Sequence, residues 1–142
     1  MTEEFSMSKD TASLLAQLKQ LTAGLLFLSE SDYPVVPFTL PGNGKQTLSV
    51  NDLTSLLKTR SGGPVKEMDF EQFFSNSTQV QEWQGPEELE TVKRFQALVK
   101  TLKENLGEIK VYQVGEIDAD VYVVGRTVTG DWAGVSTRVV ET

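Results

Sequence analysis

The 142-residue sequence contains no histidine and no cysteine. Histidine is the side chain most often used as a general base near neutral pH, and it is the commonest nitrogen ligand of transition metals. Without cysteine there are no disulfides, no thiolate nucleophile and no cysteine-ligated zinc site. The two absences together exclude Ser-His and Cys-His catalytic pairs and favour a protein that is not an enzyme.

Long apolar runs and a basic N-terminus are also missing. The longest early apolar run covers only residues 25–28, and the chain opens with Met1-Thr2-Glu3-Glu4, where a secretory signal needs basic residues. We therefore expect no export signal, no membrane contact and a cytoplasmic location. The length is typical of one domain, so we predict a flexible N-terminus over residues 1–10 and a single domain over residues 11–142.

Acidic residues outnumber basic ones by 20 to 13, which gives a formal charge of −7. Such a field repels phosphate backbones and anionic lipids, so we expect no direct binding of nucleic acid, and a basic or metal-bearing partner is more natural. The charge is also segregated along the chain. Seven acids and no base lie in residues 67–90, whereas five bases lie in residues 93–110.

Leucines at helical spacing predict an amphipathic helix over about residues 11–25, with Asp10 or Thr11 as its cap. A shorter helix is predicted near residues 49–60. Between these helices, residues 33–40 include two prolines, which lack an amide proton. Any strand there should therefore be interrupted or lie at a sheet edge.

The middle of the chain carries clear helix boundaries. A short strand is predicted over residues 65–68, and Asp69 with Gln72 three residues later resembles a capping box for a short helix. The clearest helix is predicted from Pro86, which suits a first turn, to about Leu106, with Gly107 placed to end it. Its apolar residues fall on one stripe: Leu89, Val92, Phe95, Val99, Leu102 and Leu106.

Alternating β-branched and aromatic residues predict three consecutive strands over residues 109–117, 121–128 and 135–141. The segments 118–120 and 129–131 are predicted to form the turns between them. A meander of this kind with helices packed on it indicates one α+β domain.

Glu116, Asp118 and Asp120 alternate at a spacing that suits a hard cation. Aspartate is also common in turns, and no calcium-loop pattern is present, so we interpret these residues as turn surface and assign no metal. The sequence has neither a phosphate-binding loop nor a dinucleotide fingerprint. We expect no cofactor.

Two surface features leave alternatives open. Trp83 lies in the mostly polar segment 79–84, where no periodicity requires a large apolar side chain. It can anchor an interface, or it can fold back as a lid on the core. Glu30 lies in an acidic segment directly after the apolar run that ends at Leu28. It can be a preorganised carboxylate for a partner, or part of an ordinary polar turn.

Two blocks of the chain resemble the nuclease A inhibitor family. One covers residues 24–34, Gly-Leu-Leu-Phe-Leu-Ser-Glu-Ser-Asp-Tyr-Pro, and the other covers almost everything from Phe73 onward. The most specific part is residues 133–142, Ala-Gly-Val-Ser-Thr-Arg-Val-Val-Glu-Thr, and residues 111–116 and 120–125 match the preceding strands. The resemblance covers well over half of the chain and excludes chiefly residues 37–66.

The resemblance implies an α-β-α sandwich with a mainly antiparallel sheet, like that of pathogenesis-related proteins. It also implies an inhibitor of a magnesium-dependent, sugar-nonspecific DNA/RNA nuclease with a ββα-metal active site. The family's contact residues correspond to Glu30, Gln81, Trp83 and Thr142. In a one-to-one complex that blocks the active site, Glu30 would replace a substrate phosphate, and the carboxylate of Thr142 would approach the magnesium ion of the nuclease.

Two other hypotheses remain open. A non-catalytic adaptor or regulatory module of the same fold could bind another basic protein, and Trp83 and the acidic stretch fit that role equally well. A hydrolase would need a pair of carboxylates with separated pKa values, and no pattern in the sequence selects one.

Overall fold

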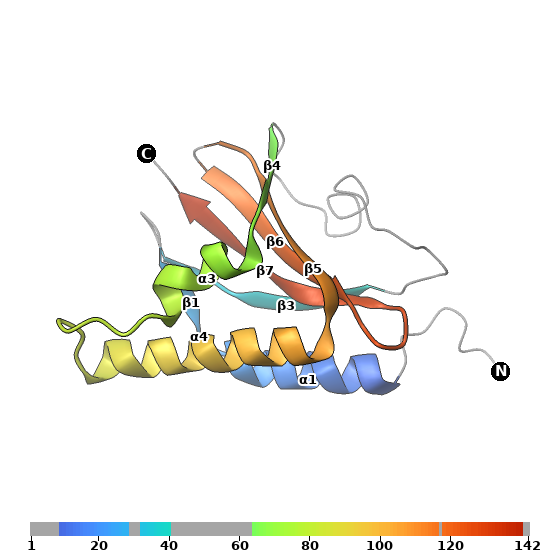
Figure 1. The fold of residues 1–142 in the computed structure, drawn as a ribbon, viewed down its shortest axis with the longest axis horizontal. Coiled ribbons are helices and arrows are strands. Elements are labelled where there is room, and N and C mark those ends of the chain that lie inside the picture. Colours follow the sequence, from blue (N-terminus) through green and yellow to red (C-terminus); the bar gives the residue numbers. More distant parts are fainter. Residues whose placement is uncertain (1–8, 29–31, 41–63, 117, 141–142) are drawn as a thin grey trace.

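The computed structural model describes residues 9–28, 32–40, 64–116 and 118–140 (Figure 1). A five-stranded antiparallel sheet has the order β3-β7-β6-β5-β4, and β1 and β2 form a small antiparallel pair of their own. The elements in chain order are α1 (Lys9–Thr22), β1 (Leu26–Leu28), β2 (Asp32–Pro34), β3 (Val36–Leu40), β4 (Val65–Met68), α3 (Phe70–Thr78), α4 (Pro86–Asn105), β5 (Gly107–Val114), β6 (Asp118–Arg126) and β7 (Trp132–Val140).

The three described helices lie together on one face of the sheet (Figure 1). Their buried side chains share one apolar cluster with the inward residues of β5, β6 and β7, including Leu18, Phe95 and Val123. The opposite face has a cluster of its own: Phe38, Leu40, Val114, Tyr122, Val124 and Trp132. This arrangement confirms the predicted α+β fold with a mainly antiparallel sheet. The short helix predicted near residues 49–60 lies outside the described residues, and the second helical layer of a sandwich stays a prediction.

The predicted meander of three strands is confirmed as β5, β6 and β7. β6 and β7 pair along their whole length, with Val124 opposite Gly134. A Cβ atom on Gly134 would overlap the carbonyl oxygen of Val123, so the close approach of the two strands requires glycine there. Among the described residues, β3 pairs with β7 alone and lies at the sheet edge, as Pro37 inside it and Pro34 just before it predict.

The turn between β5 and β6 differs from the prediction. Asp118 and Asp120 are not turn residues, because β6 already begins at Asp118 and both residues pair with β7. The chain reverses earlier, at Gly115, whose φ of +113° favours glycine and where a Cβ would lie 2.9 Å from the carbonyl oxygen of Asp118. The glycine thus marks the turn more reliably than the aspartates do.

Gly107 is predicted to end α4, but the helix ends before it. The helix ends at Asn105, and Leu106 is already extended, with φ −122° and ψ 139°. Gly107 is the first residue of β5, and the left-handed residue is Glu108, with φ 51°. The register between β5 and β6 shifts between Gly107 and Lys110, so the left-handed residue belongs to an irregularity in the strand pairing rather than to a helix cap.

α1 begins at Lys9, two residues before the predicted start, so Thr11 lies inside the helix and is not its cap. The buried Thr11 hydroxyl instead donates to Oδ2 of Asp131 at 2.7 Å and lies 3.4 Å from the hydroxyl of Thr127. The β6–β7 turn thereby supplies a buried carboxylate near the positive end of α1, where the helix dipole favours negative charge. None of the described helices is both long enough and apolar enough to cross a membrane.

The cap predicted for α3 is confirmed. The Asp69 carboxylate accepts a hydrogen bond from the backbone N–H of Gln72 at 3.0 Å. Phe73 and Phe74 then enter the core, where Phe27 of β1 stacks on Phe73 with ring centroids 4.7 Å apart. Phe27 also meets Phe95 of α4 edge to face, so this aromatic cluster joins β1 to both helices.

Candidate interaction site

The loop between α3 and α4 is closed by hydrogen bonds that its own residues supply. The backbone N–H of Gln84 donates to the carbonyl oxygen of Gln81 at 3.2 Å, which forms a four-residue turn. The side-chain oxygen of Gln84 returns and accepts from the N–H of Gln81 at 2.8 Å. Glu82 and Trp83 are therefore the two central residues of a turn that is fixed from both sides.

Both ends of this loop are tied to the helices. At the start of α4, the N–H of Gly85 donates to Oε1 of Glu88 at 2.9 Å, as in a capping box. At the end of α3, the carbonyl oxygen of Thr78 accepts from Nε2 of Gln96 at 2.9 Å. The loop is thus held in position relative to α3 and α4.

Trp83 is 74% exposed, so it does not cover the core, and the lid interpretation is wrong. Val80 and Leu26 nearby are 64% and 41% exposed. A large exposed aromatic ring on an ordered turn is typical of an interface anchor, because the fixed backbone of the turn loses little freedom when a partner covers the ring. Gln81 is exposed on the same turn.

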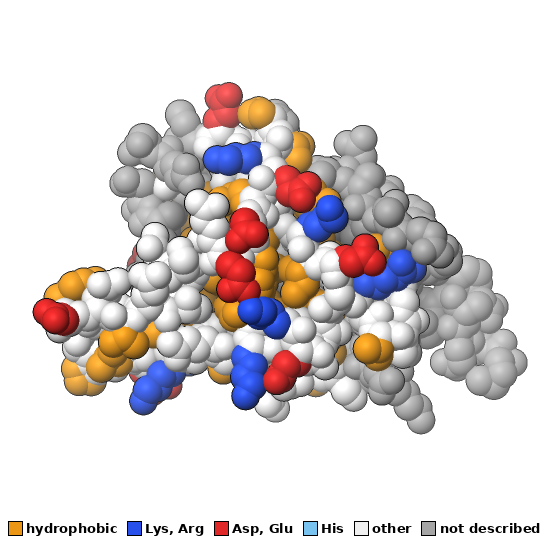
Figure 2. Space-filling view, in the orientation of Figure 1, with side chains coloured by type: hydrophobic (Ala, Val, Ile, Leu, Met, Phe, Trp, Pro, Cys, Tyr) orange, Lys and Arg blue, Asp and Glu red, His pale blue; other side chains and the backbone are white. Residues whose placement is uncertain are grey.

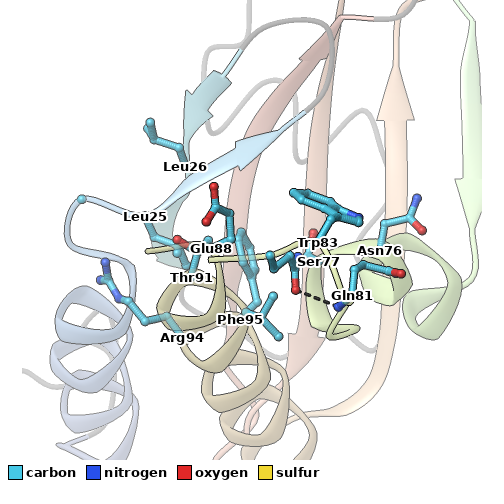
Figure 3. A pocket seen from close by; sticks show the side chains of 13 residues that line it. Leu25, Leu26, Asn76, Ser77, Gln81, Trp83, Glu88, Thr91, Arg94 and Phe95 are labelled. Carbon is cyan, nitrogen blue, oxygen red and sulfur yellow. Dashed lines mark hydrogen bonds between the residues drawn. The ribbon is translucent and has the colours of Figure 1, made fainter. Parts of the chain in front are cut away.

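A pocket of about 490 Å³ lies beside Trp83 (Figure 3). The turn between α1 and β1, the C-terminal half of α3, the α3–α4 loop and α4 all line it. We call it the Trp83 pocket; its described lining residues are Gly24, Leu25, Leu26, Asn76, Ser77, Gln81, Trp83, Gln84, Glu88, Thr91, Val92, Arg94 and Phe95. The two sequence-predicted contact residues that the structure describes therefore share one pocket.

Glu30 and Thr142 lie outside the described residues, but the strands that lead to them are described. β1 ends at Leu28 and β2 begins at Asp32, on either side of the Glu30 segment, and β7 ends at Val140. A second pocket brings these strands together, because Phe27 of β1 and Val139 of β7 line it with Asn76 and Ser77.

Asn76 and Ser77 line both pockets, so the C-terminal half of α3 lies between the Trp83 turn and the strands that lead to Glu30 and Thr142. Figure 1 shows the same grouping, with β1, the arrowhead of β7 and the α3–α4 loop on one side of the molecule. The sequence could not indicate that α3 joins these segments, since the two residues that line both pockets, Asn76 and Ser77, are small and polar.

Charge on the helix-covered side is mixed (Figure 2). Lys103 of α4 forms an ion pair with Glu71 of α3, and Lys110 of β5 lies 3.6 Å from Glu67 of β4. Acidic residues of segment 67–90 and basic residues of segment 93–110 therefore lie next to each other in the structure. At the tip that the α3–α4 loop forms in Figure 1, acidic and apolar side chains are exposed together (Figure 2).

Asp118 and Asp120 hold Arg138 rather than a metal ion. Nη2 of Arg138 lies 2.6 Å from Oδ1 of Asp118, and Nη1 donates to Oδ1 of Asp120 at 2.8 Å. The hydrogen bond with Asp118, followed by the charge of Asp120, raises the pKa of Arg138 above its ordinary value although partial burial opposes this. Among the described residues, no group of three acidic side chains is arranged to bind a metal ion.

The sequence did not predict the Arg138 ion pairs. The pattern that could have indicated them is the alternation of Asp118 and Asp120 in a strand that pairs with the strand carrying Arg138. The ion pairs tie β6 to β7 two residues before Val140, where β7 ends. They hold the last strand in register immediately before the chain continues to Thr142.

A comparison with protein-family models assigns residues 12–142 to the family described as nuclease A inhibitor-like protein. The chain belongs to the nuclease A inhibitor-like family. A comparison with curated proteins gave no match. Membership suggests that the chain is a nuclease inhibitor, a non-catalytic protein whose partner is a nuclease. The match agrees with the family resemblance seen in residues 24–34 and in the C-terminal strands.

Proposed function

We propose that this member of the nuclease A inhibitor-like family inhibits a magnesium-dependent, sugar-nonspecific DNA/RNA nuclease by forming a one-to-one complex that occludes the active site. The observation that carries the proposal is the 74% exposure of Trp83 on a turn closed by two hydrogen bonds. The loop offers a partner a large apolar contact at a small cost in entropy. Gln81 on the same turn supplies hydrogen bonds at the rim.

Glu30 and the C-terminal carboxylate of Thr142 perform the second part of the proposed mechanism. A nuclease that binds phosphates presents arginines and an open magnesium position, and both attract carboxylates. Glu30 replaces a substrate phosphate, and Thr142 approaches the metal through its bound water. The described strands support these two roles, because β1, which leads to the Glu30 segment, and β7, which leads to Thr142, line one pocket with α3.

The net charge of −7 supports fast association with a basic nuclease surface. Electrostatic steering of this kind weakens as salt screens the charges, so the association rate should fall between low and physiological ionic strength. Inhibition requires no chemistry from the inhibitor, because a bound protein that fills the active site excludes both DNA and RNA.

The test is a titration of the protein into a ββα-metal nonspecific nuclease that degrades plasmid DNA and RNA. Magnesium is kept in large excess, so that chelation by acidic side chains does not imitate inhibition. We expect a sharp endpoint at one inhibitor per nuclease with both substrates. Lack of inhibition across several such nucleases at micromolar protein would contradict the proposal and favour an adaptor of the same fold.

Two variants test the proposed contacts. Glu30→Lys should weaken inhibition strongly, because a lysine would face the arginines that bind phosphate. A few residues added after Thr142 should block the approach to magnesium and also weaken inhibition. Wild-type inhibition by either variant would remove the corresponding role from the mechanism.

A further inference from the structure

The Trp83 pocket combines an apolar interior with an acidic rim. Leu25, Val92 and Phe95 supply buried apolar surface, and the exposed ring of Trp83 lies at the edge. Glu88 is the acidic residue among the described lining residues (Figure 3). A pocket of this composition suits a side chain with an apolar stem and a cationic end.

Glu88 is positioned by the start of α4. Its Oε1 atom accepts the hydrogen bond from the N–H of Gly85, and the described residues place no hydrogen bond on Oε2. One carboxylate oxygen therefore orients the side chain, and the other remains for a ligand. Asn76, Ser77 and Gln81 also line the pocket and carry further side-chain oxygens. A guanidinium carries five N–H donors, so it suits a pocket that offers a carboxylate together with other acceptors.

Arg94 is the basic residue among the described lining residues, and its charge is already engaged. Its Nη2 atom donates to the carbonyl oxygens of Leu21 and Ala23, which lie at and just beyond the last turn of α1. Figure 3 shows Arg94 on the side of α1, away from Trp83. The negative end of the α1 dipole offsets its charge there. Glu82 of the α3–α4 loop and Glu87 in the first turn of α4 add exposed negative charge.

We propose that the Trp83 pocket binds an arginine side chain of the nuclease, with the stem on Leu25 and Phe95 and the guanidinium between Glu88 and the ring of Trp83. This inference rests on the proposed function and assigns Glu88 as a further binding residue, separate from Glu30. Arginine fits better than lysine, because its planar guanidinium stacks on an indole and reaches several acceptors at once. The protein's net charge of −7 complements such a partner.

Glu88→Gln is the decisive variant. Glutamine at this position keeps the capping hydrogen bond to Gly85 and removes only the charge. Glu87→Gln is the matched control, since it removes the same charge one residue earlier in the same helical turn, outside the pocket lining. Equal thermal unfolding midpoints for both variants would show that the fold is intact.

The affinity of each variant for the nuclease is measured by calorimetry in magnesium. We expect Glu88→Gln to bind about 10- to 100-fold more weakly, the usual loss for a hydrogen bond to a charged group, and Glu87→Gln to change binding only by long-range charge. Equal losses in the two variants would overturn the pocket assignment and leave the proposed inhibition standing.

If the wild type binds no nuclease, the proposed function fails. A small arginine analogue then tests separately whether the pocket binds an arginine side chain. N-acetyl-arginine methylamide is titrated while tryptophan emission is followed, with the norleucine analogue as the uncharged control. Trp83 is exposed and Trp132 is buried, so a perturbation of the exposed indole reports on the pocket. A shift that requires arginine and Glu88 supports the pocket. A response that is the same in Glu88→Gln, or no response, overturns it.

Discussion

Trp83 and Trp132 are the two tryptophans of the chain, and they lie in regions with opposite properties. Trp83 is 74% exposed at the tip of the α3–α4 loop, whereas Trp132 is 7% exposed at the start of β7. Trp132 lies opposite Leu40 of β3 and Arg126 of β6 in the sheet. The Arg126 guanidinium carbon lies 5.2 Å from the centroid of its ring.

The sequence around both tryptophans is similar, since each follows an acidic residue near a turn. Their different exposure comes from strand pairing. Two neighbouring strands flank Trp132 and bury it, whereas Trp83 occupies a turn that is closed by hydrogen bonds between Gln81 and Gln84. Large aromatic area therefore stabilises the fold at one position and remains available to a partner at the other. Substitutions can separate these two roles.

The largest expected effect is on stability, from Trp132→Ala. Removing a buried tryptophan leaves a cavity in the apolar cluster of the second sheet face, with a typical cost of about 3–5 kcal/mol. The indole N–H of Trp132 has no hydrogen-bond partner among the described residues, so its loss should offset part of that cost. Urea unfolding measures the change. A loss below about 1 kcal/mol would mean that Trp132 does not support the core.

The next effect is on binding, from Trp83→Ala. The free energy of unfolding should stay within about 0.5 kcal/mol of the wild type, because the side chain is exposed. The affinity for the nuclease should fall by about 2 kcal/mol or more, as for other central aromatic anchors. Calorimetry with the folded variant measures this change. Unchanged affinity would contradict the role of the loop.

A smaller effect on stability should follow from Asp69→Ala, which removes the cap of α3. The expected loss is about 1 kcal/mol, because the N–H of Gln72 loses its acceptor. Asp69→Asn is the control, since asparagine caps nearly as well. Chemical denaturation of the two variants tests whether α3, which lies between the two pockets, depends on its cap. Equal stability of Ala and Asn variants would contradict that dependence.

The smallest effect is expected from Lys103→Gln, which removes the ion pair with Glu71. Both side chains are more than half exposed, and such pairs contribute about 0–1 kcal/mol. Neither the free energy of unfolding nor the free energy of nuclease binding should change by more than about 1 kcal/mol. A large loss of affinity would mean that the α3–α4 face, and not the Trp83 loop, contacts the partner.

Periodic segments were predicted best from the sequence. α4, the cap of α3 and the three C-terminal strands follow from regular spacing and local hydrogen-bond chemistry, which act over a few residues. The β1–β2 pair was not predicted, because three-residue strands carry too little alternation to detect. Asp118 and Asp120 were misassigned to a turn because their partner, Arg138, is distant in sequence.

The candidate site was predictable only in part. Trp83 stood out as an aromatic without a periodic reason, but its exposure depended on the hydrogen bonds of Gln81 and Gln84, which sequence patterns do not indicate. Gln81 itself was selected by the family resemblance alone. Glu88 is one of several acids near the start of α4, and nothing in the sequence sets it apart; the pocket shows that it also lines a cavity.

The most direct measurement follows both tryptophans in one experiment. The protein is labelled with 5-fluorotryptophan, and its two fluorine resonances are recorded as unlabelled nuclease is added in magnesium. We predict that the resonance of Trp83 shifts and saturates at one equivalent, whereas that of the buried Trp132 keeps its position. Saturable binding that leaves the Trp83 resonance unchanged would contradict the claim that the exposed loop is the nuclease-binding surface.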